Sequence, residues 1–401
     1  MDCLIIGKVW PEPRSTAAGR RTLDLIRALR QAGWGIGMAS PAQRNTHSFD
    51  LAALGVDTFP VRVNDSGFDD WIRGLAPQIV IFDRFMTEEQ FGWRVEQACP
   101  DALRVLDTSD LHCLREARQQ VVERRVALDL FNATALREIA SIHRSDLTLM
   151  ISEYEIALLK DVFAIPSNQI AYWPFVLEAK PTLPPSYDER EHFIQIGSFL
   201  HPPNLDAARW CKAVIWPHIR RALPSVELHL YGAYGEKYQS SLHDPANGFI
   251  FKGRANDALA TMQQYRVNLV PLRYGAGLKG KIFDGFETGT PSCATPVGAE
   301  GIAGSGAWGG AASEDSGQFA ERAVALYSDP EEWARVQAQG QSIVVERFDA
   351  AIWSPRLPPL LEAAYTARDQ NRARNFTGRM LRHHQHRSTE FMSRWIEAKN
   401  A

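Results

Sequence analysis

Short apolar runs separated by helical segments are the feature that most constrains the fold of this chain. The clearest are 79–83 (IVIFD) and 102–107 (ALRVLD). Similar runs occur at 3–10, 35–40, 57–61 and 147–152, and a helical pattern spans about Ala18 to Ala32. Nearly continuous apolar runs are typical of parallel strands covered on both faces. The alternation predicts βαβ units and a doubly wound parallel sheet, with 147–152 as its last strand.

The alternation stops at a proline-rich, charged segment, 178–192, and then restarts. Further strands are predicted at 193–199, 226–232, 248–253, 267–273 and 291–296, and a helix from about Asn204. A chain of 401 residues is too long for one ordinary core, which favours two domains. We therefore predict an α/β protein in which two Rossmann-like domains face a cleft. The predicted parts are an N-terminal domain (1–177), a linker (178–192), a C-terminal domain (193–352) and terminal helices (353–401) that partly pack back on the first domain.

Composition excludes several classes of protein. The net charge of −3 gives no basic excess that would indicate a nucleic-acid-binding protein. The five cysteines are scattered without CxxC spacing, which argues against a disulfide framework or a structural zinc site. No run of 18 apolar residues and no signal peptide is evident. The expected location is therefore the cytoplasm, with neither a metal nor another cofactor.

The segment 274–295 (YGAGLKGKIFDGFETGTPSCAT) points most directly to chemistry. Gly275 and Gly277 follow a strand and precede a helix, where glycine lets backbone N–H groups approach a ligand. A helix N-terminus attracts anions, and Lys279 and Lys281 add positive charge there. With Arg273 at the end of the preceding strand, these groups predict a diphosphate site.

Two alternatives bear on this segment. A glycine turn with solvated lysines is the simpler structural interpretation. Because no GKS or GKT follows the glycines, the segment is not a P-loop, and ATP hydrolysis is not expected. Asp284 lies about one helical turn beyond Lys281 and is well placed to accept hydrogen bonds from ribose hydroxyls.

At this point the chain resembles a known family. Segment 271–302 resembles the donor-binding segment of retaining glycosyltransferases of family 4, which have the GT-B fold. Segment 193–210 resembles the first strand, loop and helix of their C-terminal domain, and 11–20 resembles a glycine-containing loop that faces the donor. The helices after Trp353 resemble terminal helices that cross back to the N-terminal domain.

The resemblance implies roles for individual residues. Arg273 and Lys281 would bind the nucleotide diphosphate with Lys279 as a helper, and Asp284 would hold the ribose. Further donor contacts are implied for Gly19, Ser198, Tyr274, Gly275, Gly277, Gly298, Ala299 and Glu300. The chain departs from the family at Ala276, where relatives often carry a glutamate assigned to the donor sugar. Asp284 is one methylene shorter than the usual second glutamate, and the loop GSFLHPPN lacks a basic residue that many relatives have.

Residues at strand ends of the first domain are candidates for the acceptor side. His112 is expected to contact the donor sugar or the acceptor hydroxyl, with Asp107 and Asp110 orienting it or binding acceptor. A helix N-cap at Ser109 or Asp110, with His112 merely exposed, is the alternative. Asp83 and Arg84 form either a structural ion pair or part of the acceptor wall.

The expected function is metal-independent, retaining transfer of a sugar from a UDP- or GDP-sugar to an acceptor hydroxyl. His112, Arg273 and Lys281 would be the catalytic residues. A GT-B sugar-nucleotide epimerase and a catalytically degenerate nucleotide-sugar-binding protein are the alternatives. Expected acceptors are a glycan, a lipid-linked glycan or another hydroxyl-bearing molecule. The Arg/His run at 372–387 is either a solvated helix face or a contact for an anionic acceptor, lipid headgroups at the inner face of the membrane, or RNA, with nucleic acid the least expected partner.

Overall fold

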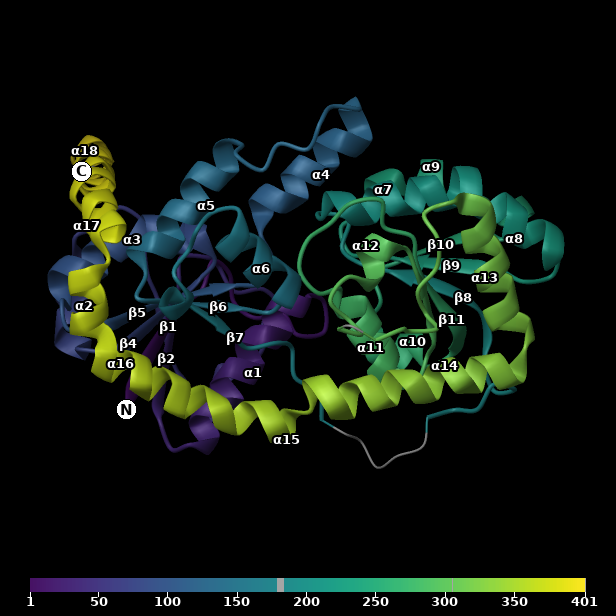
Figure 1. Cartoon of the computed structure of the whole chain (residues 1–401), viewed down its shortest axis with the longest axis horizontal. Helices are drawn as coiled ribbons and strands as arrows, with labels where there is room; N and C mark the ends of the chain where they lie inside the picture. The colour runs from purple at the N-terminus through teal and green to yellow at the C-terminus, as the bar shows by residue number, and fades with distance from the viewer. Residues whose placement is uncertain (179–183, 305, 401) are drawn as a thin grey trace.

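Two all-parallel sheets lie side by side in the chain (Figure 1). The computed structural model describes residues 1–178, 184–304 and 306–400. Both sheets have helices packed around them, and the strands of each sheet end toward the other domain. The predicted α/β class with two Rossmann-like domains is therefore confirmed.

The first sheet has the strand order β3-β2-β1-β4-β5-β6-β7. Its strands are β1 (Asp2–Ile6), β2 (Gly35–Ser40), β3 (Asp57–Pro60), β4 (Ile79–Asp83), β5 (Leu103–Thr108), β6 (Leu147–Met150) and β7 (Ile170–Tyr172). Its helices are α1 (Ala17–Gln31), α2 (Gly67–Leu75), α3 (Phe85–Ala98), α4 (His112–Arg124), α5 (Ala133–Arg144) and α6 (Glu153–Asp161). The prediction that 147–152 ends the series was wrong, because β7 adds a seventh strand too short to form a recognisable apolar run.

The second sheet has the order β10-β9-β8-β11-β12. Its strands are β8 (Glu191–Ile196), β9 (Leu228–Tyr231), β10 (Phe249–Gly253), β11 (Tyr265–Val270) and β12 (Ser292–Ala294). The helices are α7 (Pro202–Trp210), α8 (Trp216–Ala222), α9 (Gln239–Leu242), α10 (Ala258–Met262), α11 (Gly280–Thr288), α12 (Pro296–Ala299), α13 (Ser316–Ser328) and α14 (Pro330–Ile343).

Alternate residues of the central strands bury against opposite faces of their sheet. In β1, Cys3 and Ile5 belong to one hydrophobic cluster, whereas Leu4 and Ile6 belong to another. A strand covered on both faces must be apolar at every position, which explains the continuous runs in the sequence. The first strand is shorter than predicted and ends at Ile6, after which the Gly7 N–H still donates to the Ala39 carbonyl (2.8 Å).

The linker predicted at 178–192 falls between the two sheets. Part of it, 179–183, lies outside the described residues. Its last two residues, Glu191 and His192, instead begin β8, so the second sheet starts earlier than predicted.

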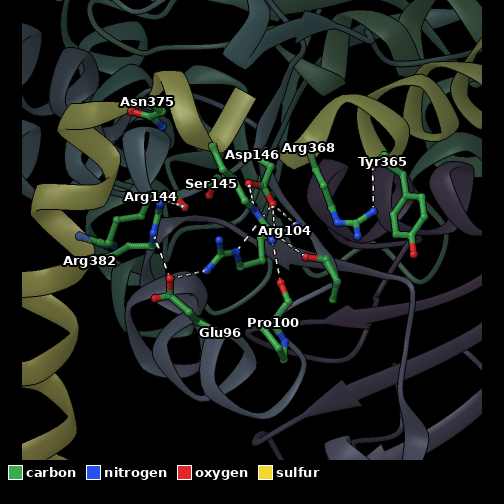
Figure 2. Close-up of polar contacts among 12 residues, drawn as sticks. Glu96, Pro100, Arg104, Arg144, Ser145, Asp146, Tyr365, Arg368, Asn375 and Arg382 are labelled. Carbon is green, nitrogen blue, oxygen red and sulfur yellow. Dashed lines mark hydrogen bonds and ion pairs between the residues drawn. The ribbon is translucent and has the colours of Figure 1, made fainter. Parts of the chain in front are cut away.

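The terminal helices cross from the second domain back to the first (yellow in Figure 1). They are α15 (Ala350–Trp353), α16 (Leu357–Arg374), α17 (Phe376–Leu381) and α18 (Arg387–Asn400). Buried ion pairs hold them there. Arg372 donates to both carboxylate oxygens of Asp146 (2.7 Å each). Arg382 pairs with Glu96 (3.0 Å) (Figure 2). The Arg/His run is therefore partly buried against the first domain and is not simply a solvated face.

Candidate functional site

The N-termini of two helices from different domains meet at the cleft. Helix α11 begins at Gly280 and helix α1 at Ala17. A Cβ atom on Gly280 would lie 2.6 Å from the Ala17 Cβ, so only glycine permits this approach. Within the described residues, no side chain caps the start of α11, although Thr16 caps α1. Uncapped N–H groups and the positive end of a helix dipole favour an anion at this point.

Lys281 reaches from the first turn of α11 to the loop that follows β8. Its ammonium donates to the Asn204 side-chain carbonyl (2.8 Å). A Cβ on Gly197 would lie 3.0 Å from that ammonium nitrogen, so the loop passes directly beside the charge. Burial lowers the pKa of Lys281 to about 8. A cation whose charged form is destabilised in this way gains most from an anionic ligand.

Lys281 belongs to a larger group of cations that we call the cleft cations. They are Lys8 and Arg115 from the first domain, and Lys279 and Lys281 from the second. Burial lowers the pKa of each member below its ordinary value. Two histidines, His112 and His201, lie beside them, and burial lowers their pKa values as well.

Mutual repulsion adds to the effect of burial. Burial and the charges of Arg115 and Lys281 lower the pKa of His201 to about 3, so its ring is neutral near pH 7. The sequence analysis missed Lys8, Arg115 and His201. Each follows or lies near the carboxyl end of a strand. That position was the one feature of the sequence that could have indicated a role in the site.

A carboxylate occupies the glycine turn of segment 274–278. Glu155 of α6 accepts the Gly277 N–H (2.7 Å) and the Leu111 N–H (3.3 Å). Gly277 has a φ of +63°, and a Cβ there would lie 2.6 Å from the Ser109 carbonyl oxygen. The turn is therefore packed against the first domain, and its N–H already has a protein partner. Burial raises the pKa of Glu155, while the nearby Lys279 charge opposes that rise.

Further contacts hold the same turn to helix α4. Arg118 forms a two-bond ion pair with Glu300 (3.0 and 2.7 Å) and also donates to the Gly275 carbonyl (2.8 Å). The Tyr274 hydroxyl donates to Glu123 (3.4 Å). These contacts place Tyr274, Gly275 and Glu300 at the interface between the domains. Glu155, Arg118 and Glu123 were missed because their partners lie more than a hundred residues away in sequence.

Asp284 meets the first domain through Arg20. The Arg20 guanidinium lies 3.4 Å from an Asp284 carboxylate oxygen and also contacts Glu287. Burial raises the pKa of Asp284 to about 6, against the opposing charge of Arg20. A cavity of about 490 Å³ adjoins Arg20 and Glu287, between α1 and α15.

Arg273 does not share the surroundings of Lys281. It forms an ion pair with Asp206 of α7, and 37% of its side chain remains exposed. Its guanidinium lies over the Trp210 ring, 6.0 Å from the centroid. For Arg273 and Lys281 to bind one diphosphate together, as predicted, the ion pair between Arg273 and Asp206 would have to break.

Two of the predicted acceptor-side carboxylates have structural partners. Asp107 is buried and accepts three hydrogen bonds from Arg21 (2.6–3.0 Å), so its expected role of orienting His112 is replaced by an internal ion pair. Asp83 accepts two bonds from Arg84 (2.9 and 2.7 Å), which is the ion-pair alternative. Arg84 adopts a φ of +68°, a strained value for a residue other than glycine, at the carboxyl end of β4.

His112 lies at the first position of α4, beside the glycine turn. Its Nε2 lies 3.5 Å from Asp110, and its ring packs edge-on against Phe85. Only 12% of its side chain is exposed, so the alternative of a merely exposed histidine was wrong. Asp110, which contacts both His112 and Arg115, is the carboxylate that positions the ring.

The remaining predicted residues have mostly backbone roles. Gly19 lies inside α1, and a Cβ there would approach the Glu12 nitrogen to 2.5 Å. It therefore packs on its own loop, whereas Ala17 and Arg20 contact the other domain. Ser198 accepts from Asn204 through its carbonyl (2.9 Å). Gly298 and Ala299 lie in α12, and Thr295 caps that helix through the Gly298 N–H (3.3 Å).

Comparison with known proteins identifies the second domain and the fold. Residues 190–329 match the family described as glycosyl transferases group 1. No curated protein sequence matches the chain. Among solved structures, sucrose-phosphate synthase from Thermosynechococcus elongatus is 15% identical, with a TM-score of 0.71 over 92% of this chain and 100% of that one.

Two further structures have the same fold. HepE of Anabaena, solved with UDP and glucose, is 14% identical with a TM-score of 0.68, over 90% of this chain and 100% of that one. WaaG, a glycosyltransferase of lipopolysaccharide biosynthesis, is 12% identical with a TM-score of 0.60, over 91% and 98% of the two chains. The predicted GT-B fold and the resemblance to glycosyltransferases are thus confirmed. The chain has the GT-B fold, and residues 190–329 in its second domain match the glycosyl transferases group 1 family.

Proposed function

We propose that this chain transfers a sugar from a nucleoside-diphosphate sugar to an acceptor hydroxyl, with retention and without a metal. The second domain would bind the nucleotide, and the first would bind the acceptor. The single observation that carries the proposal is the group of cleft cations, which both domains contribute around the uncapped start of α11. Burial lowers the pKa values of Lys279 and Lys281 to about 8, so an anion that binds beside them would stabilise their charged forms.

These cations also supply the chemistry for which other enzymes use a metal. As the bond between the anomeric carbon and the diphosphate oxygen breaks, negative charge develops on the leaving group. Fixed ammonium and helix-terminal N–H groups stabilise that charge in a site with little water. The acceptor oxygen would attack the anomeric carbon from the same face, and its proton would pass to a phosphate oxygen of the leaving diphosphate. His112, whose lowered pKa keeps its ring neutral near pH 7, would hydrogen-bond a sugar hydroxyl.

UDP is the nucleotide present in the solved complexes of two similar structures. HepE was solved with UDP and glucose and with UDP-glucose, and TarM was solved with UDP and α-GlcNAc-glycerol. We therefore propose a UDP-sugar donor. Every helix within residues 1–178, 184–304 and 306–400 is too short or too polar to span a bilayer. A cytoplasmic location, peripheral contact with a membrane and the class of acceptor stay predictions.

Glu155 supports the epimerase alternative. An epimerase needs an acid or base beside the sugar, and the glycine turn carries Ala276 where a family carboxylate would stand. Glu155 brings a carboxylate to the same turn from the other domain, with a raised pKa that suits proton transfer. An epimerase would convert a UDP-sugar when no acceptor is present, whereas a transferase would not.

A donor screen tests the proposed function. Thermal unfolding with UDP-, GDP-, ADP- and TDP-sugars should show the largest rise in melting temperature with a UDP-sugar, because a ligand that binds only the folded state stabilises it. Incubation of that donor with acceptor mixtures should then release UDP, equally with Mg²⁺ or EDTA. Binding without release would support the degenerate binding protein. Dependence on Mg²⁺ would contradict the metal-independent mechanism.

The affinity for UDP should fall as the pH rises from 7 to 9. Lys281 binds an anion only in its protonated form, and its pKa of about 8 means that most of the charge is lost by pH 9. One such lysine accounts for a loss of roughly ten-fold. Calorimetric titration with UDP at several pH values and constant ionic strength measures how the affinity depends on pH. An affinity that stays constant or increases with pH would show that Lys281 does not carry the binding.

A further inference from the structure

A second group of ligating side chains lies at the opposite end of β8 from the cleft. It consists of His192 at the start of β8, Glu227 just before β9, and His229 within β9. One ligating atom from each of the three residues lies within 4.8 Å of the others. The transfer chemistry proposed above uses none of them.

The strand register brings these residues together. Strands β8 and β9 are parallel neighbours, with Phe193 opposite Leu228 and Ile194 opposite His229. Side chains two residues apart in a strand point to the same face, so Glu227 and His229 share one side of the sheet. His192 has a φ of +60°, which is rare for a residue other than glycine and redirects its side chain. The Glu227 N–H donates to Nδ1 of His192 (3.3 Å), which holds the ring beside the Glu227 backbone. This long bond would be given up on metal binding, because a neutral imidazole has only one nitrogen lone pair in its plane.

The surrounding hydrogen bonds match those of a metal-binding histidine. Nε2 of His229 lies 2.7 Å from a Glu227 carboxylate oxygen, a hydrogen bond whose proton a metal ion between the two ligands would replace. Nδ1 of His229 lies 2.7 Å from the Tyr265 hydroxyl, which in turn lies 3.0 Å from the Tyr231 hydroxyl. Histidines that bind metals generally use their second nitrogen for such a bond, which fixes the ring and its tautomer.

We propose that His192, Glu227 and His229 bind one Zn²⁺ ion, with water completing the coordination. Two imidazoles and one carboxylate are ligands that zinc accepts, whereas Mg²⁺ and Ca²⁺ prefer oxygen ligands alone. The ion would tie β8 to β9 on the side of the second domain away from the cleft. Its role would therefore be to stabilise the domain, and the proposal stands whether or not the chain transfers a sugar.

Zinc titration of the full chain tests the site. After the protein is treated with a chelator and dialysed, one Zn²⁺ ion per chain should bind tightly when ZnCl₂ is added. The melting temperature should rise with zinc concentration. His229→Ala and Glu227→Gln should each abolish this tight binding. Tyr265→Phe should weaken it by roughly 10-fold or more, since it removes only the partner of Nδ1. Thermal unfolding of the metal-free variants checks that they fold.

Two control variants separate this site from other histidines. His218→Ala removes an exposed histidine of α8 in the same domain and should leave zinc binding unchanged. His383→Ala with His384→Ala removes the adjacent pair in the terminal run and should also retain one tight zinc. If the tight ion persists in His229→Ala, or disappears with the terminal pair, the proposal is overturned. UDP binding should be the same in wild type and His229→Ala, because the cleft lies at the other end of the strands.

Discussion

Replacing Lys281 with methionine should weaken UDP binding by roughly 10- to 100-fold, because a charge-assisted hydrogen bond contributes about 1.5–3 kcal/mol. Turnover should fall further, by about 100-fold, since the ammonium would also stabilise charge on the departing diphosphate. Methionine preserves the length and apolar stem of the side chain. The substitution therefore tests the charge itself and introduces little change in packing.

Stability should change in the opposite direction. Burial lowers the pKa of Lys281 to about 8, so the folded protein disfavours the charged form. Removing that charge should leave the melting temperature unchanged or raise it, as is common for residues kept for function at a cost in stability. Calorimetric titration with UDP and thermal unfolding of the same preparation measure both effects. A variant that lost binding and stability together would indicate a structural lysine.

Two companion variants sharpen the result. Lys252→Met removes an exposed lysine of the same domain and should affect neither UDP binding nor turnover. Lys281→Met should also reduce the pH dependence of UDP affinity between pH 7 and 9, and the dependence that remains would come from Lys279, whose pKa burial also lowers to about 8. Unchanged UDP affinity in Lys281→Met would remove the central support for the proposed function.

The fold could be predicted from the sequence because local patterns determine most of it. The runs at 35–40 and 79–83 coincide with β2 and β4, since a strand buried on both faces must be apolar throughout. The seventh strand was missed because Ile170–Tyr172 is only three residues long and lacks that signature. The predicted linker wrongly included residues 191–192 for a similar reason, because these two polar residues at the start of β8 lack an apolar strand pattern.

The candidate site was only partly predictable because its geometry depends on contacts between the domains. The sequence analysis singled out Lys279, Lys281 and His112 from motif position alone. It had no signal that Glu155 would cross to Gly277. The pattern Ser152-x-x-Glu155 suggests an ordinary capping box, in which the glutamate would turn back on its own helix. Ser152 does cap the helix (3.4 Å), but the Glu155 carboxylate reaches the other domain instead.

The second large effect is expected at Glu88, a buried carboxylate of α3 that contacts both helix α5 and the terminal Arg/His run. It pairs with Arg144 of α5, accepts from the Ser141 hydroxyl (2.6 Å), and lies 3.5 Å from His386 of the terminal run. Glu88→Ala would leave the Arg144 guanidinium buried without its charged partner. Breaking a buried pair in this way costs about 3–5 kcal/mol, so we expect a marked fall in the free energy of unfolding.

The adjacent residue supplies a matched control. Glu89 also forms an ion pair, with Arg137, but 54% of the Arg137 side chain is exposed. Glu89→Ala should therefore cost less than about 1 kcal/mol. Chemical denaturation of both variants measures the difference, and limited proteolysis shows whether the terminal helices α16–α18 separate first. Equal stability of the two variants would mean that Glu88 is not a principal attachment of those helices.

Because of the same cluster, the free energy of unfolding should decrease both at low pH and at higher pH. The charges of Arg144 and His386 hold the pKa of Glu88 at about 2, so its contribution is present above its ordinary value of about 4.5 and is lost as the pH falls toward 2. His386 donates hydrogen bonds to Glu88 and Glu96, and these bonds raise its pKa above the ordinary value of about 6.5 despite burial. That contribution is complete below pH 6.5 and is lost as the pH rises through the raised value. The terminal helices should thus be held most tightly to the first domain between about pH 4.5 and 6.5. In Glu88→Ala, the loss of stability below pH 4.5 and the loss above pH 6.5 should both become smaller. If Glu88→Ala lowered the free energy of unfolding by the same amount at every pH, this coupling would be contradicted. Such a uniform loss is what an uncharged packing defect would cause.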